Sequence, residues 1–331
     1  MNPTDYSLFG HNSGPRRAGK GAVILRQCGP FGFAADIANF RYNPSMLRRL
    51  FLLVCALALA APLQTFPQQS APPASSARTL LLPKRIVTGE AATLAVLDMN
   101  GRLTPGATVN FSNGDHLVTN ATGRALFVAP LNPGVIYATI GSRPSRAYST
   151  ILTPAEVSSA SLEVSSAPRF ASLSDRFELS GSGFCGQADA NVVRVAGKPA
   201  LVLASSPAAL VALPPTDLEP GPASVEVSCA KRSPASFSIT FLGLTLDADS
   251  SPLAPGEHRT LTVKVRGTVA PVALEARNLS PEVAELAGGN PARVSSSGGT
   301  ENVAHFELIG HQRGNFIVSV RLLPTPIPLR R

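Results

Sequence analysis

The chain has 331 residues, of which 15% are charged and 6% aromatic, and it carries 30 Pro, 27 Gly, no Trp and a formal net charge of +8. Residues 1–60 hold seven of the 29 Lys/Arg and two of the 21 Asp/Glu, so the remainder has a net charge of only +3 and no basic run before Arg330 and Arg331. This balance argues against a nucleic-acid-binding protein, and the spread of Pro and Gly argues against long helices.

A short apolar stretch, MLRRLFLLVCALALAAP at residues 46–62, has the three parts of a secretory signal peptide. Two arginines precede an apolar run of about a dozen residues, whereas a membrane-spanning helix needs about 20. The A-x-A pattern predicts cleavage between Ala60 and Ala61. Lipidation at Cys55 is the weaker alternative, because bulky residues precede this cysteine.

Residues 1–45 show no apolar period, and we predict that they are a disordered extension upstream of a true start at Met46. A long, unusual n-region is the alternative. Residues 61–78 are rich in Pro, Ser and Gln and predict a disordered linker. The chain is therefore expected to be secreted, to the periplasm, the outer surface or the medium.

The remaining residues predict an all-β protein of tandem Ig-like antiparallel sandwiches. Short runs of alternating apolar residues are separated by Gly, Pro, Asn and Asp clusters throughout this part. Turn chemistry divides it into three domains at residues 79–153, 160–242 and 243–323, followed by a tail at 324–331.

Residues 79–153 alternate in strands such as ATLAVLD at residues 92–98, in which Leu94 and Val96 are expected to face the core and the opposite face is expected to be polar. The phrase ATVNFSNGD at residues 107–115, followed by TNATGRA at residues 119–125, resembles bacterial Ig-like repeats. That resemblance implies an Ig-like sandwich.

Residues 160–242 carry the more specific pattern. GSGF at residues 181–184 is followed by NVVRVAG at residues 191–197 and by PGP at residues 220–222. This segment resembles an IPT/TIG domain, an Ig-like fold found in cell-surface receptors, some transcription factors and bacterial surface proteins. Glycines suit the bend because they reach positive φ, and Phe184 is then expected in the core.

Residues 243–323 resemble generic bacterial Ig-like domains only weakly. HRTLTVKVRG at residues 258–267 alternates as a half-buried strand. In a second alternating run, the pattern places His305 toward solvent. The tail LPTPIPLRR is too Pro-rich for a central strand.

Cys185 and Cys229 are the only cysteines after the predicted signal peptide, and an even pair in an oxidising compartment predicts a disulfide. A metal site is the alternative, although two cysteines without a nearby histidine pair are a poor zinc set. A bridge around about 44 residues would contribute roughly 4 kcal/mol in the chain-entropy model.

No catalytic, cofactor-binding or metal site is predicted. A metal centre would need His258, His305 and His311 to converge, and the glycines before Phe184 lack the following helix that a nucleophile elbow or phosphate loop requires. The acidic pair Asp247 and Asp249 has a spacing used by calcium sites, but such pairs are usually solvated.

The sequence therefore predicts a non-enzymatic binding or scaffold protein of the cell envelope, of the adhesion type. The expected partner is an envelope or surface protein, without nucleic acid, and the membrane is met only through the signal peptide before cleavage. The alternative is an accessory module of an exported polysaccharide-processing system that binds wall polysaccharide. The scarcity of Trp and Tyr weighs against the alternative. A hydrolase is a third possibility, but the sequence offers no residue that can be named as catalytic.

Overall fold

The computed structural model describes residues 78–141, 145–157, 161–230, 232–248, 253–312, 316–323 and 325–328. The predicted extension, the signal peptide with its cleavage site at Ala60 and Ala61, and the linker up to residue 77 lie outside these ranges. Within them, no helix has the length and apolar character needed to cross a membrane.

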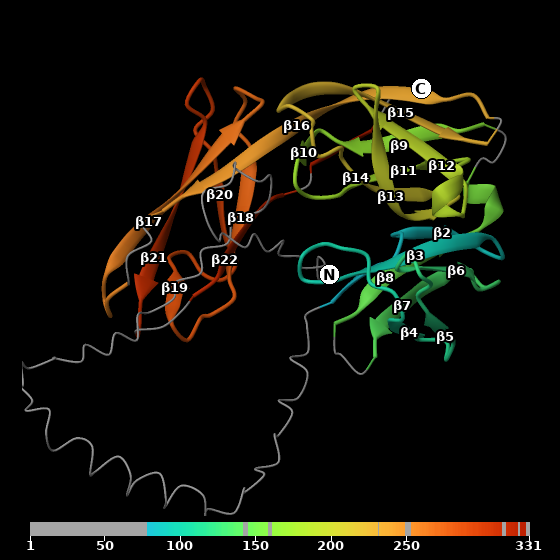
Figure 1. The fold of residues 1–331 in the computed structure, drawn as a ribbon, viewed down its shortest axis with the longest axis horizontal. Coiled ribbons are helices and arrows are strands. Elements are labelled where there is room, and N and C mark those ends of the chain that lie inside the picture. The colour runs from blue at the N-terminus through green and yellow to red at the C-terminus, as the bar shows by residue number, and fades with distance from the viewer. Residues whose placement is uncertain are drawn as a thin grey trace, which may run out of the picture. The chain divides into compact units, whose positions relative to one another are not determined.

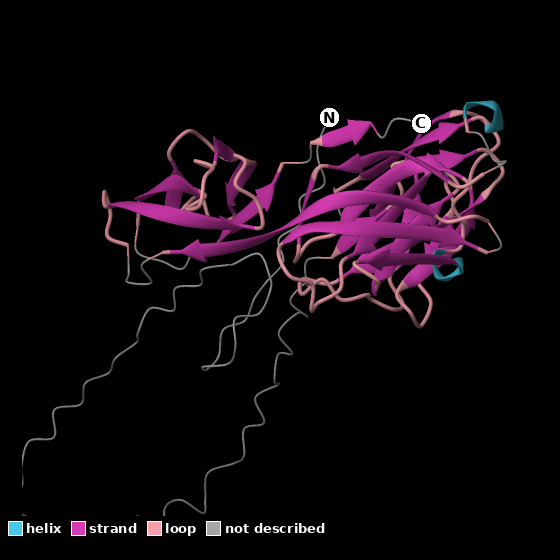
Figure 2. Ribbon diagram, turned by 90° about the horizontal axis from the view of Figure 1, so that it is seen from above, coloured by secondary structure: helices cyan, strands magenta, loops and turns pink. Residues whose placement is uncertain are grey.

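The described residues form strands and connecting turns, with two short 3-10 helices at Pro154–Glu156 (η1) and Ala188–Ala190 (η2) (Figures 1 and 2). Strand pairs are antiparallel except for β2 with β8 and β10 with β16. The predicted all-β fold of tandem Ig-like sandwiches is confirmed.

The first sandwich packs two sheets around one apolar core. One sheet contains β1 (Thr79–Leu81), β3 (Ala91–Leu97) and β6 (Arg124–Val128); the other has the order β2 (Arg85–Val87), β8 (Ala147–Leu152), β7 (Gly134–Ile140), β4 (Thr108–Phe111) and β5 (His116–Val118). Alternate strand residues, including Leu94, Val96 and Val109, fill the core between them. Phe111 and Phe127 meet there with ring centroids 5.1 Å apart.

The middle sandwich contains strands that are longer than any strand of the first sandwich. Its strands are β9 (Glu163–Pro168), β10 (Phe170–Ser172), β11 (Phe177–Ser182), β12 (Asn191–Val195), β13 (Lys198–Ser206), β14 (Ala209–Leu213), β15 (Gly221–Cys229) and the first part of β16 (Ala235–Asp247). β13 pairs with β12 through its first residues and with β14 through its last, so one strand belongs to both sheets. Phe177 and Phe241 pack edge to face at 5.6 Å in the core.

The glycine bend of this sandwich fits the sequence argument. Gly183 has φ +76°, and a Cβ there would lie 2.4 Å from the carbonyl oxygen of Ser161. Phe184 is buried, as predicted.

The last sandwich contains β17 (His258–Arg266), β18 (Ala273–Asn278), β19 (Ala284–Leu286), β20 (Ala292–Ser295), β21 (Val303–Gly310) and β22 (Val318–Leu322). Leu261, Val263 and Val265 of β17 are buried while the residues between them are not, which confirms the predicted alternation. His305 is exposed, as expected.

The middle and last sandwiches share one strand. β16 pairs with β15 as far as Phe241, opposite Gly221, and with β17 from Gly243, opposite Arg266. The change of partner lies between Phe241 and Gly243. The predicted domain boundary at 242/243 stays a prediction. Near the end of the chain, β23 (Pro326–Pro328) pairs with β9 at a sheet edge, a position that a Pro-rich strand can occupy.

Candidate functional site at the junction of the first two sandwiches

β3 is buried on both of its faces, and it forms the junction between the first and the middle sandwich. Ala92, Leu94 and Val96 face the core of the first sandwich. Ala95 and Leu97, on the opposite face, pack with Leu203 and Val211 of the middle sandwich. The expectation of a polar outer face for this strand is therefore wrong, because a second sandwich covers it.

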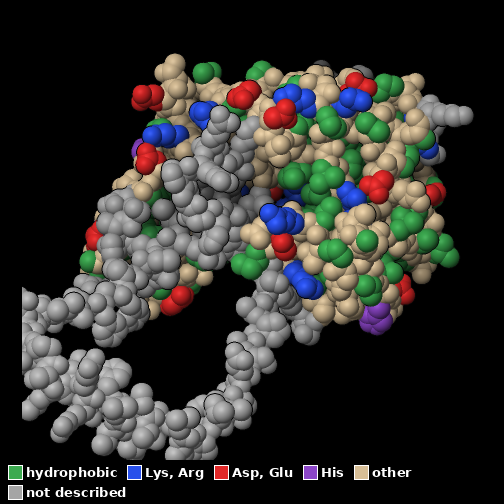
Figure 3. All heavy atoms as spheres, viewed as in Figure 1, with side chains coloured by type: hydrophobic (Ala, Val, Ile, Leu, Met, Phe, Trp, Pro, Cys, Tyr) green, Lys and Arg blue, Asp and Glu red, His purple; other side chains and the backbone are tan. Residues whose placement is uncertain are grey.

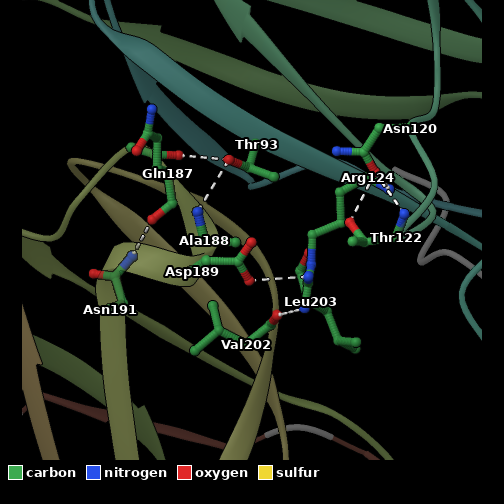
Figure 4. A network of polar contacts seen from close by, with 11 residues as sticks. Thr93, Asn120, Thr122, Arg124, Gln187, Ala188, Asp189, Asn191, Val202 and Leu203 are labelled. Atoms are coloured by element: carbon green, nitrogen blue, oxygen red, sulfur yellow. Dashed lines mark hydrogen bonds and ion pairs between the residues drawn. The ribbon is translucent and has the colours of Figure 1, made fainter.

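A buried arginine crosses the junction from the first sandwich. The guanidinium of Arg124 donates from Nη2 to the carbonyl oxygen of Val202 at 2.5 Å and from Nε to that of Leu203 at 3.3 Å. Its Nη1 lies 3.0 Å from Oδ1 of Asp189 (Figure 4). The Arg124 side chain is only 8% exposed, so these contacts replace the water that it loses.

A second polar contact lies on the neighbouring strand. Thr93 Oγ1 donates to the carbonyl oxygen of Gly186 at 2.8 Å and accepts from the backbone N–H of Ala188 at 3.1 Å (Figure 4). Gly186 allows this approach, since a Cβ there would lie 2.0 Å from the carbonyl oxygen of Ala91. Thr93 and Ser205 also pair as strand residues, which joins the sheets of the two sandwiches.

A disulfide lies beside this junction. Cys185 and Cys229 are bonded, with Cα atoms 5.7 Å apart, and the bridge connects the end of β15 to the loop after β11. Asn191 supports the loop: its Oδ1 accepts from the backbone N–H of Cys185, and its Nδ2 donates to the carbonyl oxygens of Cys185 and Gln187. The side chain also lies 2.9 Å from Ser205 Oγ.

A cleft of about 430 Å³ opens between the two sandwiches at the disulfide. Val87, Glu90 and Ala91 line it from the first sandwich, and Phe184 and Gln187 from the middle one. Arg232, also on its lining, donates to the carbonyl oxygen of Gly183. The lining is mainly apolar, with the carboxylate of Glu90, the amide of Gln187 and the guanidinium of Arg232, and no nucleophile lies beside a base among its residues.

The other sequence candidates do not converge in the described residues. His258 pairs with Glu307 at 2.6 Å and His311 with Glu285 at 3.3 Å, while His305 lies 3.2 Å from Thr262. Asp247 pairs with Lys264 at 2.9 Å, and Asp249 lies outside the described ranges. No group of three or more His, Cys, Asp or Glu side chains that could hold a metal occurs in the described part of the chain.

Sequence reasoning missed Arg124. The available signal was an arginine that opens the otherwise apolar strand RALFV, at a position that alternates away from the core. The surface seen in Figure 3 carries Lys and Arg interspersed with Asp and Glu, so that face shows no single-sign patch.

Comparisons with known proteins give no family. No protein-family model and no curated protein sequence matches the chain. Among solved structures, it is similar to SGBP-B of the Bacteroides ovatus mixed-linkage glucan utilization locus, solved with a mixed-linkage heptasaccharide, at 13% identity over 78% of this chain and 77% of that one, with a TM-score of 0.30.

Two further solved structures illustrate the breadth of this likeness. Sidekick-1 immunoglobulin domains 1–4 match at 12% identity over 71% of this chain and 76% of that one, with a TM-score of 0.24. Domains 1–6 of the surface layer protein SbsC match at 12% identity over 76% of this chain and 40% of that one, with a TM-score of 0.17. These likenesses concern the tandem β-sandwich fold alone.

Proposed function

We propose that this chain is an exported, non-enzymatic scaffold of the cell envelope that holds binding surfaces of tandem Ig-like domains in fixed relation. In this proposal residues 46–60 direct export, cleavage separates Ala60 from Ala61, and the mature domains occupy residues 79–153, 160–242 and 243–323. The middle domain is of IPT/TIG type, and the partner is an envelope protein.

The coupling between sandwiches is the observation that carries the proposal. Arg124 and Thr93 connect the first sandwich to the middle one through buried hydrogen bonds. β16 continues from the middle sandwich into the last without a linker. Surfaces on such a chain keep their spacing, which is what a scaffold requires and a set of beads on flexible linkers lacks.

The disulfide supports an oxidising compartment. Structural disulfides persist in exported proteins and are rare in reducing cytosol. Cys185 and Cys229 form such a bridge between a loop and a strand end.

Cross-linking on intact cells, followed by mass spectrometry of the attached molecules, tests the proposal. We expect one dominant envelope protein as partner, and no such adduct from a control chain that begins at residue 61 and stays in the cytosol. Retention of the full chain in the cytosol, or an adduct pattern equal to that of the control, would contradict the proposal.

The accessory carbohydrate-linked role is the second candidate. It is favoured by one feature, a pair of tyrosines on the outer face of the first sandwich, Tyr148 exposed and Tyr137 half-buried, from which the inference below is drawn. Recovery of wall glycan without a protein partner in the same experiment would support it over the scaffold.

A further inference from the structure

The structure brings together two aromatic residues that the sequence leaves eleven positions apart. Tyr137 on β7 and Tyr148 on β8 form a cross-strand pair, with ring centroids 5.7 Å apart. They are the only Tyr residues beyond the predicted linker of a chain that has no Trp. Both alternate with core residues, so their rings lie on the outer face of the five-stranded sheet.

A cation accompanies this pair. The Arg146 guanidinium lies over the Tyr137 ring, with Cζ 4.5 Å from the ring centroid. Arg146 is exposed, and among the described residues its one recorded side-chain contact is with the Tyr137 ring. The cation–π contact holds the guanidinium in place while leaving its N–H groups available to a ligand.

Around the tyrosine pair the sheet face is open, and none of the outward strand residues is acidic. Tyr148 is 47% exposed, and Val118 and Val135 at other outward positions are 61% and 69% exposed, so this part of the face is open. The β2 end of the face is covered, because Val87 and Leu152 are buried in a cluster with Val157 and with Ala208 of the middle sandwich. The outward residues of the strands are Arg85, Val87, Thr108, Asn110, His116, Val118, Val135, Tyr137, Thr139, Tyr148, Thr150 and Leu152. None of them is Asp or Glu, so the charge of the face complements an anion.

We propose that this face binds an acidic polysaccharide, with a sugar ring stacked on Tyr148 and a uronate carboxylate paired with Arg146. A Tyr ring at the surface offers its π-face to the apolar C–H face of a sugar. An arginine fork recognises a carboxylate through two parallel hydrogen bonds. The open part of the sheet face, unlike a closed pocket, leaves both ends of the ligand free, as a polymer requires.

A protein partner is the competing occupant for the same face, since Tyr and Arg are also enriched in protein interfaces. The glycan is favoured because the face offers one exposed ring beside an exposed guanidinium, and none of its outward strand residues is acidic. The inference goes beyond the proposed scaffold function and stands independently of it, because it concerns one surface of one sandwich.

The test is binding of the purified protein to polygalacturonate, alginate and hyaluronate, by affinity electrophoresis and calorimetry. Carboxyl-reduced polygalacturonate serves as the matched neutral polymer. We expect binding to at least one acidic polymer, at least tenfold weaker binding to the neutral one, and weakening as salt rises from 0.05 to 0.5 M.

Variants assign the binding to this face. We expect Tyr148→Ser and Arg146→Ala each to weaken binding at least tenfold, and Tyr148→Phe, which keeps the ring, to change it less than threefold. Arg102→Ala, which removes an exposed arginine of the same sandwich, is the matched control and should bind as the parent does. An unchanged unfolding midpoint shows that a variant is folded. If Tyr148→Ser fails to fold, Arg146→Ala alone tests whether the ligand binds this face.

Three results would overturn the proposal. If the protein binds none of the acidic polymers, the proposed ligand class is wrong. If it binds the neutral polymer equally well, the proposed role of the carboxylate is wrong. Binding that survives both Tyr148→Ser and Arg146→Ala places the site elsewhere. A protein cross-linked through a photoreactive residue at position 148, without polysaccharide binding, would give the face to a protein partner and leave the scaffold function intact.

Discussion

Single buried polar residues show how the sandwiches tolerate polar groups inside. Asn191 and Glu275 are both almost inaccessible to water, and each meets partners on several sides. A buried polar group costs free energy when its partners are missing and little when they are present. Substitution of either residue should therefore cost more than substitution of an exposed residue of the same type.

Asn191→Ala should destabilise the middle sandwich by about 3 kcal/mol, because it leaves the backbone N–H and carbonyl oxygen of Cys185 without the Asn191 partner. Urea unfolding with the disulfide intact measures the change. Asn113→Ala, at an exposed turn, is the control and should cost less than about 0.5 kcal/mol. Equal costs for the two variants would show that Asn191 does not support the loop.

Glu275 makes a pH-dependent contribution. Burial alone would raise the pKa of this carboxyl, but hydrogen bonds and charges from Arg321 and Arg293 outweigh burial and hold the pKa below its ordinary value of 4.5. A carboxyl with a lowered folded-state pKa stabilises the fold above its unfolded-state pKa. That stabilisation is lost as pH falls through the folded-state pKa.

Glu275→Gln should lower the free energy of unfolding by about 3 kcal/mol at pH 7, because it leaves the charges of Arg293 and Arg321 uncompensated. The difference between the two proteins should shrink as pH falls below 4.5 toward 3. Urea titrations at several pH values measure it, with the exposed Glu282→Gln as control. A difference that stays constant with pH would contradict the assigned pKa direction.

At the scale of elements, strand patterns predict burial only where one face of the strand meets water. β17 follows this rule, with Leu261 and Val263 inside and Lys264 outside. β3 does not, because Ala95 and Leu97 are covered by the middle sandwich. The disulfide adds a covalent link between elements, since it pins the end of β15 to the loop after β11.

Replacing Cys185 and Cys229 together by Ser should destabilise the middle sandwich by roughly 4 kcal/mol, because the bridge closes a loop across a sequence separation of 44. Urea unfolding measures the loss. A reducing agent should bring the parent protein to the stability of the variant and leave the variant unchanged. The parent protein can be unfolded, reduced and refolded. If its free energy of unfolding stayed the same after this reduction, the stabilising role of the bridge would be contradicted.

At the scale of the whole molecule, the described sandwiches are coupled rather than strung on linkers. The first and middle sandwiches share an apolar cluster, a pair of strand residues and the Arg124 contacts. The middle and last share β16. Coupled domains unfold together when their interface is large and hydrophobic.

Arg124→Ala should uncouple the first sandwich, because the carbonyl oxygens of Val202 and Leu203 lose their donor. We expect calorimetry to show one transition for the first two sandwiches in the parent and two in the variant, with a loss of about 2 kcal/mol. Arg102→Ala, which removes an exposed arginine, should keep the single transition. Separate transitions in the parent would show that the sandwiches are not coupled.

The sequence alone determined the fold class and much of the local structure. Alternation identified strands such as β17, and the glycine bend with Phe184 was predicted in place because φ restrictions and burial act within a few residues. Export and the IPT/TIG character of the middle domain stay predictions.

Tertiary structure alone decided the junction and the tyrosine face. The burial of Ala95 and the inward course of Arg124 depend on a second sandwich, more than 70 residues away along the chain. The pairing of Tyr137 with Tyr148, and the place of Arg146 over a ring, depend on the register of β7 with β8. Contacts of this kind arise from the packing of whole elements, and the residue pattern along one strand does not reveal them.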